Sequence, residues 1–141
     1  MQGARFNPPE SFPVLYICRS RPCVVAELER LGTLQAIGVD GLLPRSLYKY
    51  DVELERVLDL TNESVRSLIG VDPNVLTGPD WTVCREIGSA FHALGVQAIL
   101  SPSATGIGEI LAVFAQNIGL GIVRPIFVEN WGTSDQIYRQ D

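Results

Sequence analysis

Four side chains in this sequence are of types that bind phosphate or sugar groups. Arg5 lies in a glycine-containing N-terminal segment, and its planar guanidinium can bind two phosphate oxygens at once. Glu27 borders the apolar face of a predicted helix, where a carboxylate can line a cleft. Tyr16 is the only polar-tipped residue of a short apolar run, and Ser103 follows a predicted strand. These residue types suit recognition of an anionic ligand and stabilisation of positive charge.

The helical pattern separates two neighbouring glutamates. Glu27 lies about 70° from the centre of the apolar face, whereas Glu29 lies about 130° away and points further toward water. Simpler interpretations stay open for each candidate. Arg5 can be a surface residue near the terminus, and Glu27 can form an i, i+3 ion pair with Arg30. Tyr16 can be an ordinary core tyrosine.

The sequence gives little support for a nucleophilic hydrolase or for a metal site. Ser103 is not in a Gly-x-Ser-x-Gly setting, and His92 is the only histidine, which argues against a Ser-His-Asp hydrolase. We therefore expect Ser103 to be a hydrogen-bonding group on a loop. The three cysteines form no Cys-x-x-Cys pair, so we expect reduced thiols and no metal.

Composition limits the class of protein. The 141 residues suit a single domain over 1–141, and 46% hydrophobic with 19% charged residues is a globular balance. The formal net charge of −5 argues against direct nucleic-acid binding, which needs clustered Lys and Arg. No apolar stretch reaches the length of a membrane span and no secretory signal is present, so we expect a cytoplasmic protein.

Strands and helices alternate irregularly, which favours an α+β fold. The predicted strands are Pro13–Cys18, one or two within Leu47–Leu60, Val96–Leu100, Ile110–Ala115 and Gly121–Val128. The last two are expected to form a hairpin through residues 117–119. The predicted helices are Arg21–Leu31 (Ser20 cap, Gly32 stop), a short one between Thr61 or Asn62 and Gly70, and Trp81–Leu94 (Asp80 cap, Gly95 stop). Loops are predicted at residues 33–46, 71–79 and 101–108, and the polar tail 131–141 is expected to fray.

In order along the chain, several short motifs resemble those of the RES domain family, most strongly over residues 3–114. They are Gly3-Ala4-Arg5-Phe6-Asn7, Val14-Leu15-Tyr16, Val25-Ala26-Glu27-Leu28, Asp59-Leu60-Thr61, Asp80-Trp81 and Ile99-Leu100-Ser101-Pro102-Ser103-Ala104. The intervals Arg5 to Tyr16 and Tyr16 to Glu27 are both 11 residues (16 − 5 and 27 − 16), as the family pattern requires.

The resemblance implies an ADP-ribosyltransferase-like α+β domain with a split central sheet and short helices. It implies a toxin that degrades NAD by phosphorolysis or hydrolysis of the nicotinamide–ribose bond, silenced by an Xre-like antitoxin. NAD would be the substrate and inorganic phosphate a possible co-substrate. Glu27 would stabilise the oxocarbenium-like transition state, Arg5 would hold pyrophosphate or phosphate, and Tyr16 and Ser103 would contact the substrate. A protein ADP-ribosyltransferase or a catalytically impaired binding domain are the alternatives, and homo-oligomerisation is open.

Two features depart from the family pattern. The family has a further stretch before the Gly-Arg segment, with an Arg and often a Tyr that line the site, whereas here only two residues precede Gly3. We expect either a misplaced gene start or a shortened relative. Glu109 stands where the family often has Asn, and a carboxylate there would either repel an anionic substrate or point to solvent.

Overall fold

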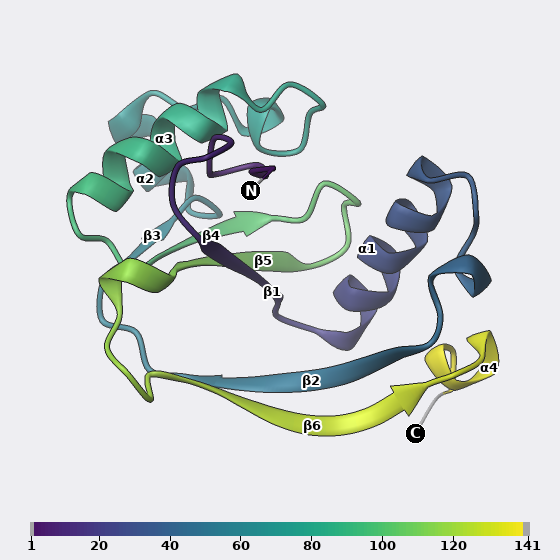
Figure 1. Cartoon of the computed structure of the whole chain (residues 1–141). Helices are drawn as coiled ribbons and strands as arrows, with labels where there is room; N and C mark the ends of the chain where they lie inside the picture. Colours follow the sequence, from purple (N-terminus) through teal and green to yellow (C-terminus); the bar gives the residue numbers. More distant parts are fainter. Residues whose placement is uncertain (1, 140–141) are drawn as a thin grey trace.

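A computed structural model describes residues 2–139, and its strands form two separate sheets (Figure 1). The strands are β1 (Val14–Cys18), β2 (Arg45–Val52), β3 (Val57–Asp59), β4 (Ala98–Pro102), β5 (Glu109–Phe114) and β6 (Val123–Trp131). The α-helices are α1 (Arg21–Leu34), α2 (Glu63–Ile69), α3 (Thr82–Ala93) and α4 (Ser134–Ile137), and short 3-10 turns cover Asp40–Leu42, Pro73–Leu76 and Ala115–Asn117.

The larger sheet has the strand order β1-β5-β4-β3, and the smaller one pairs β2 with β6. Among the strand pairings of the described residues, β3–β4 is parallel and the other three are antiparallel. In Figure 1, α2 and α3 lie over the larger sheet, the β2–β6 ribbon runs separately below it, and α1 lies to one side between them. The α+β class with a split sheet is therefore confirmed.

The predicted hairpin between β5 and β6 is wrong. Residues of β5 such as Ala112 lie between Tyr16 of β1 and Ile99 of β4, and β6 pairs with β2 instead. The connection does not turn back because the side-chain amide of Asn117 donates to the carbonyls of His92 and Val96, at 2.9 and 2.8 Å. Asn117 thus ties the end of β5 to the end of α3.

Helix α1 begins as predicted but ends later. The Ser20 hydroxyl accepts the Cys23 N–H at 3.3 Å, which confirms the N-cap. Gly32 does not stop the helix, which continues to Leu34. A Cβ at Gly32 would lie 2.6 Å from the carbonyl carbon of Gly38, so this glycine allows the following loop to pack against the helix.

The other helix ends follow the predicted signals with one exception. Asn62 caps α2, which ends at the left-handed Gly70. Asp80 is not the N-cap of α3, because Trp81 occupies that position. The Asp80 carboxylate still accepts the backbone N–H of Thr82 at 3.0 Å, and the helix ends before Gly95 as predicted.

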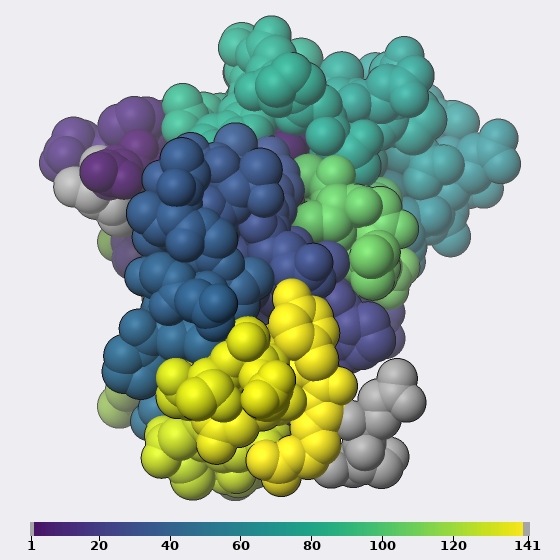
Figure 2. Space-filling model, turned by 90° about the vertical axis from the view of Figure 1, so that its right-hand side faces the viewer, coloured from purple at the N-terminus to yellow at the C-terminus, as the bar shows by residue number. Residues whose placement is uncertain are grey.

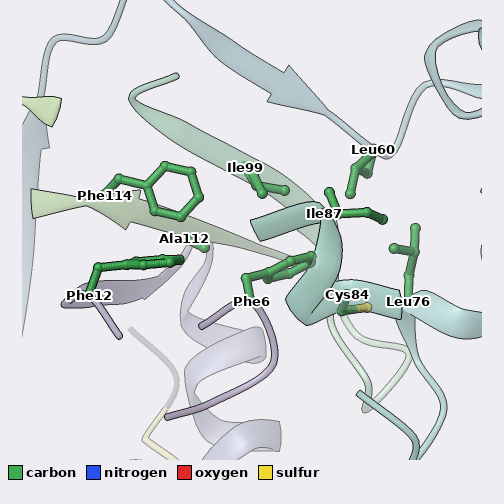
Figure 3. Close-up of a cluster of buried hydrophobic side chains, with 9 residues drawn as sticks. All are labelled: Phe6, Phe12, Leu60, Leu76, Cys84, Ile87, Ile99, Ala112 and Phe114. Carbon is green, nitrogen blue, oxygen red and sulfur yellow. The ribbon is translucent and has the colours of Figure 1, made fainter. Parts of the chain in front are cut away.

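The main core lies between α3, the 3-10 turn at residues 73–76 and the larger sheet, and the N-terminal segment is built into it (Figure 3). The buried side chains of this cluster are Phe6, Phe12, Leu60, Leu76, Cys84, Ile87, Ile99, Ala112 and Phe114. Phe6 is 2% exposed and approaches α3 at Gly88, where a Cβ would lie 1.7 Å from the Phe6 carbonyl oxygen. The contact requires glycine at this helix position.

A second core joins α1 to the C-terminal end of β6 and to α4. Leu28, Trp131 and Ile137 are buried together there, and Figure 2 shows the yellow C-terminal segment against the blue region of α1 and its following loop. The expected frayed tail is wrong for residues up to 139, because Thr133 and Gln136 form a capping box and Ile137 is 2% exposed. Residues 140 and 141 lie outside the described part.

Within residues 2–139, no helix combines the length and apolar character that a membrane span requires.

Replacing Gly88 by alanine tests the close contact between α3 and the N-terminal segment. In an open helical site this change would stabilise the fold by up to about 1 kcal/mol. Here we expect a loss of roughly 3 kcal/mol in the free energy of unfolding, because the added methyl group overlaps the Phe6 carbonyl. Urea denaturation measures it, with Glu86→Ala on the exposed face of α3 as the control. A Gly88→Ala variant as stable as the parent chain would contradict the contact.

Candidate functional site

The N-terminal loop is held against the larger sheet by Tyr16. The loop closes through the Ala4 N–H, which donates to the Asn7 carbonyl at 2.9 Å. The Tyr16 hydroxyl donates to Oδ1 of Asn7 at 2.7 Å and accepts the Phe6 N–H at 2.9 Å. Burial of Phe6 and Asn7 completes the anchorage. Strand β1 therefore fixes the position of Arg5 at the tip of the loop.

Arg5 lies beside Trp81 at the start of α3. Its Nη1 donates to the carbonyl of Gly78 at 2.9 Å and to that of Val75 at 3.4 Å. Its guanidinium lies 5.6 Å from the centre of the Trp81 ring, and that of Arg85 lies 5.2 Å from the same ring. Part of the hydrogen-bonding capacity of Arg5 thus supports the loop at residues 75–78.

Glu27 and Ser103 meet although 76 residues separate them. The Ser103 hydroxyl donates to Oε1 of Glu27 at 2.7 Å. Because a hydroxyl has one proton, the 2.7 Å contact between Ser103 and Thr105 must have the Thr105 hydroxyl as donor. The Thr105 N–H also donates to the Ser103 oxygen, at 3.2 Å. The loop after β4 thus forms a short chain of hydrogen bonds, in which Thr105 donates to Ser103 and Ser103 donates to the Glu27 carboxylate on α1.

Two cavities meet at this carboxylate. One of about 170 Å³ lies beside the N-terminal loop and α3, and one of about 450 Å³ lies between α1 and the β2–β6 ribbon. Tyr16, Glu27 and Arg30 line both. The smaller cavity is also lined by Ala4, Arg5, Phe6, Trp81, Ser101, Pro102, Ala104 and Ile110. The larger one is also lined by Ile17, Cys18, Val24, Leu28, Leu31, Leu34, Arg45, Ser46, Leu47, Tyr48, Tyr50 and Trp131.

The sequence-predicted residues therefore converge, with one difference in role. Arg5, Tyr16 and Glu27 line the smaller cavity. Ser103 is fully buried and lines neither cavity, and its hydroxyl is committed to Glu27. This arrangement favours a positioning role for Ser103 over direct contact with a ligand.

Burial controls the ionisation of two further groups in the cavity walls. Burial raises the pKa of Tyr16 to about 12, against the opposing effects of the Phe6 N–H and the nearby Arg85 and Arg5. The phenol therefore remains a neutral donor. Burial also raises the pKa of the Cys18 thiol, and a hydrogen bond with Cys23 raises it further. A protonated thiol is a poor nucleophile, which argues against a nucleophilic role for Cys18.

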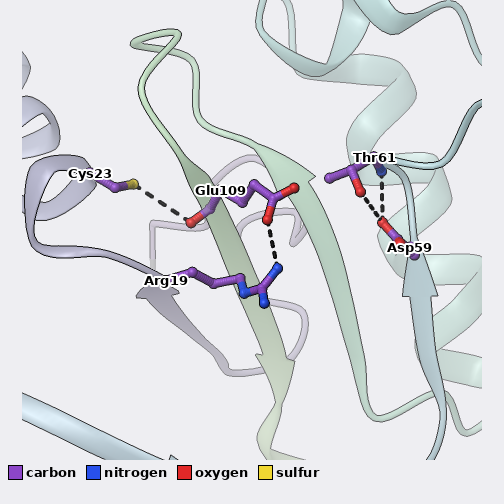
Figure 4. A network of polar contacts seen from close by, with 5 residues as sticks. All are labelled: Arg19, Cys23, Asp59, Thr61 and Glu109. Carbon is purple, nitrogen blue, oxygen red and sulfur yellow. Dashed lines mark hydrogen bonds and ion pairs between the residues drawn. The ribbon is translucent and has the colours of Figure 1, made fainter.

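Glu109 does not present a free carboxylate to the site. Figure 4 shows its ion pair with Arg19, in which Nη1 and Oε1 are 2.6 Å apart, and its backbone carbonyl lies 3.6 Å from the Cys23 sulfur. The same view shows Asp59 accepting from the N–H and hydroxyl of Thr61, which stabilises the turn from β3 into α2. The expected repulsion of an anionic substrate by Glu109 has no support, since Glu109 lines neither cavity.

Sequence reasoning missed two residues of the cavity walls, Arg30 and Trp81, as site residues. Arg30 follows Glu27 by almost one helical turn, so a sequence signal existed, but this spacing also fits a simple ion pair. Within residues 2–139, the Glu27 carboxylate instead accepts a hydrogen bond from Ser103. Trp81 reaches the site only because α3 packs on the N-terminal loop, a contact that no local pattern reveals.

The chain is similar to known proteins in both sequence and fold. A family model described as the RES domain matches residues 1–130. The NAD(+) phosphorylases MbcT of Mycobacterium bovis and Mycobacterium tuberculosis are each 32% identical over 116 residues, which cover 81% of this chain and 62% of theirs. This chain therefore spans less than two thirds of the length of these relatives. The crystal structure of the M. tuberculosis MbcT–MbcA toxin–antitoxin complex matches with a TM-score of 0.78 and 29% identity, over 90% of this chain and 72% of that one.

Replacing Tyr16 by phenylalanine tests the link between β1 and the N-terminal loop. At neutral pH we expect the free energy of unfolding to fall by about 1–3 kcal/mol, because Asn7 and the Phe6 N–H lose their hydrogen-bond partner. Folding raises the Tyr16 pKa from 10.0 to about 12, so the stabilisation is complete below pH 10.0 and disappears as the pH rises to about 12.

Urea denaturation at a series of alkaline pH values measures this effect. Between pH 10.0 and about 12, the free energy of unfolding of the parent chain should fall by about 3 kcal/mol more than that of Tyr16→Phe. The control Tyr48→Phe, which changes an exposed tyrosine, should behave like the parent. If the free energy of unfolding changed equally with pH in the parent and in Tyr16→Phe, Tyr16 would ionise as freely in the folded as in the unfolded chain, which would contradict the prediction.

Proposed function

The chain belongs to the RES domain family, and from this premise we propose that it degrades NAD by phosphorolysis of the nicotinamide–ribose bond. One observation carries the proposal. Glu27, held by a 2.7 Å hydrogen bond from Ser103, lies in the shared wall of two cavities in a chain 32% identical to NAD(+) phosphorylases.

The reaction has simple requirements. The bond between the ribose C1 carbon and the nicotinamide nitrogen breaks, and its electron pair leaves with nicotinamide, which departs neutral. An oxygen of inorganic phosphate forms the new bond to C1, and the phosphate proton passes to solvent. Positive charge develops on the sugar ring as the bond breaks, so a fixed carboxylate beside the ring lowers the barrier.

The residues of the site can take matching roles. Glu27 would stabilise the developing cation and bind the ribose hydroxyls. Ser103 would keep the carboxylate oriented, and this orientation is set before substrate arrives, as effective electrostatic catalysis requires. Tyr16, a neutral donor in both cavity walls, would pack against the nicotinamide riboside. Arg5 would contribute positive charge on the side of the smaller cavity.

The larger cavity suits the dinucleotide. Its volume of about 450 Å³ lies within the range of roughly 300–1,000 Å³ typical of ligand pockets. Tyr48, Tyr50 and Trp131 offer flat faces for an aromatic base, and Arg45 offers positive charge for a pyrophosphate. These properties support NAD as the substrate, with the scissile bond at the Glu27 wall.

We further propose that the chain acts as a toxin paired with an Xre-like antitoxin. The support is the likeness to a protein solved in a toxin–antitoxin complex. Loss of NAD would explain the toxicity, and expression of the chain should arrest growth in proportion to the fall in cellular NAD.

Replacing Glu27 by glutamine tests the central role. The amide keeps the shape and a hydrogen-bond acceptor for Ser103 but removes the negative charge, so we expect NAD consumption to fall by about 100-fold or more with the fold unchanged. Glu29→Gln, two residues along the same helix and exposed, should retain full activity. Consumption of NAD by purified protein, with product masses, measures both.

Other results would redirect the proposal. Unchanged turnover in Glu27→Gln would remove Glu27 from the chemistry. In the parent chain, ADP-ribose formed at the same rate with and without phosphate would mean hydrolysis, and ADP-ribose attached to protein would mean a transferase. NAD that binds without being consumed would mean a binding domain.

Replacing Ser103 by alanine tests its positioning role. The hydrogen bond to Glu27 is of the charge-assisted kind, worth about 1.5–3 kcal/mol, so we expect kcat to fall roughly 10- to 100-fold while the KM for NAD changes little. Ser64→Ala on the exposed face of α2 is the matched control. A rise in the KM for NAD with unchanged kcat would instead indicate direct contact between Ser103 and the substrate.

A further inference from the structure

Arg30 is a cation at the shared wall of the two cavities, and the described residues 2–139 give it no hydrogen-bond or ion-pair partner. It lies in the walls of both cavities, almost one helical turn after Glu27, and it is half-buried. Across residues 2–139, no hydrogen bond, ion pair or ring contact engages its guanidinium. Other arginines are engaged, such as Arg19 with Glu109 and Arg21 with Glu129. A half-buried guanidinium without an acceptor is suited to bind an anion from solution.

The smaller cavity has the size and charge for a small anion. Its volume of about 170 Å³ is below the roughly 300 Å³ at which typical ligand pockets begin, so it is too small for a dinucleotide. Its charged wall residues are Arg5, Arg30 and Glu27, and the two arginines outweigh the carboxylate. Apolar groups such as Trp81 and Phe6 complete the wall and strengthen electrostatic attraction by excluding water.

Arg5 has donors to spare for such an anion. Within the part of the chain that the structure describes, Nη1 of Arg5 donates to the carbonyls of Gly78 and Val75, and the Cys84 thiol also interacts with the guanidinium. A guanidinium has five N–H donors, so donors remain for a ligand, and paired donors of this kind bind tetrahedral oxyanions.

We propose that Arg30, together with Arg5, binds inorganic phosphate in the smaller cavity and so selects phosphate over water as the acceptor. The inference rests on the proposed function, which needs an acceptor beside the sugar carbon. Because Glu27 and Tyr16 line both cavities, phosphate in the smaller one and NAD in the larger one meet at that wall. Arg30 also offsets the repulsion between the Glu27 carboxylate and the incoming phosphate. An oxygen of this phosphate then forms the bond to C1 as nicotinamide leaves.

Replacing Arg30 by glutamine tests whether Arg30 binds phosphate rather than NAD. We expect the KM for phosphate to rise about 10- to 100-fold, as loss of a charge-assisted contact predicts. The KM for NAD should stay within about twofold, and the products should shift from ADP-ribose 1″-phosphate toward ADP-ribose. Arg30→Lys should recover part of the phosphate affinity. The control is Arg56→Gln, an exposed arginine that lines neither cavity, which should match the parent.

A binding measurement keeps the inference separate from catalysis. Phosphorus NMR of inorganic phosphate should show line broadening with the parent chain that is lost with Arg30→Gln. If NAD is not consumed but this Arg30-dependent binding is present, the proposed function fails and the phosphate site stands. Equal phosphate binding by the two proteins would overturn the inference, whatever the turnover. A rise in the KM for NAD with an unchanged KM for phosphate would also overturn it.

Discussion

The hydrogen bonds of the Tyr16 hydroxyl join the N-terminal loop to the larger sheet, and the geometry of the site depends on them. The hydroxyl accepts from Phe6 and donates to Asn7, so it satisfies two buried polar groups of a segment that has no regular secondary structure. Phe6 then fills the core beneath α3, and Arg5 is carried to the edge of the smaller cavity. Without this link, the loop would lack the polar contacts that align it, and α3 would lose part of its packing surface.

A second long-range hydrogen bond holds the Glu27 carboxylate. Ser103 joins the loop after β4 to Glu27 on α1, and Thr105 in turn donates to Ser103. The carboxylate is thereby oriented before a ligand arrives, in a wall shared by a cavity of dinucleotide size and one of anion size. Arg5 and Glu27 line the smaller cavity, whereas Ser103 lines neither cavity and donates its hydroxyl proton to Glu27.

The sequence predicted the local features well because caps, stops and periodicity are local signals. Ser20 marks a helix start through its own hydroxyl, and Gly70 and Gly95 mark helix ends through their left-handed backbone. The repeated spacing of Arg5, Tyr16 and Glu27 identified residues that do converge. Predictions failed where a distant contact decides the conformation. Asn117 binds the end of α3 and prevents the expected hairpin, and Ile137 orders the tail by packing against α1 and Trp131. Trp81 could not be placed in the site without knowing how α3 packs on the N-terminal loop.

The central claim is that NAD reacts with phosphate at the Glu27 wall. The most direct test incubates the purified chain with NAD, with and without inorganic phosphate, and measures the mass of the products. The account predicts phosphate-dependent loss of NAD, with nicotinamide and ADP-ribose 1″-phosphate formed in equal amounts. Intact NAD after incubation with a folded chain at saturating phosphate would contradict it.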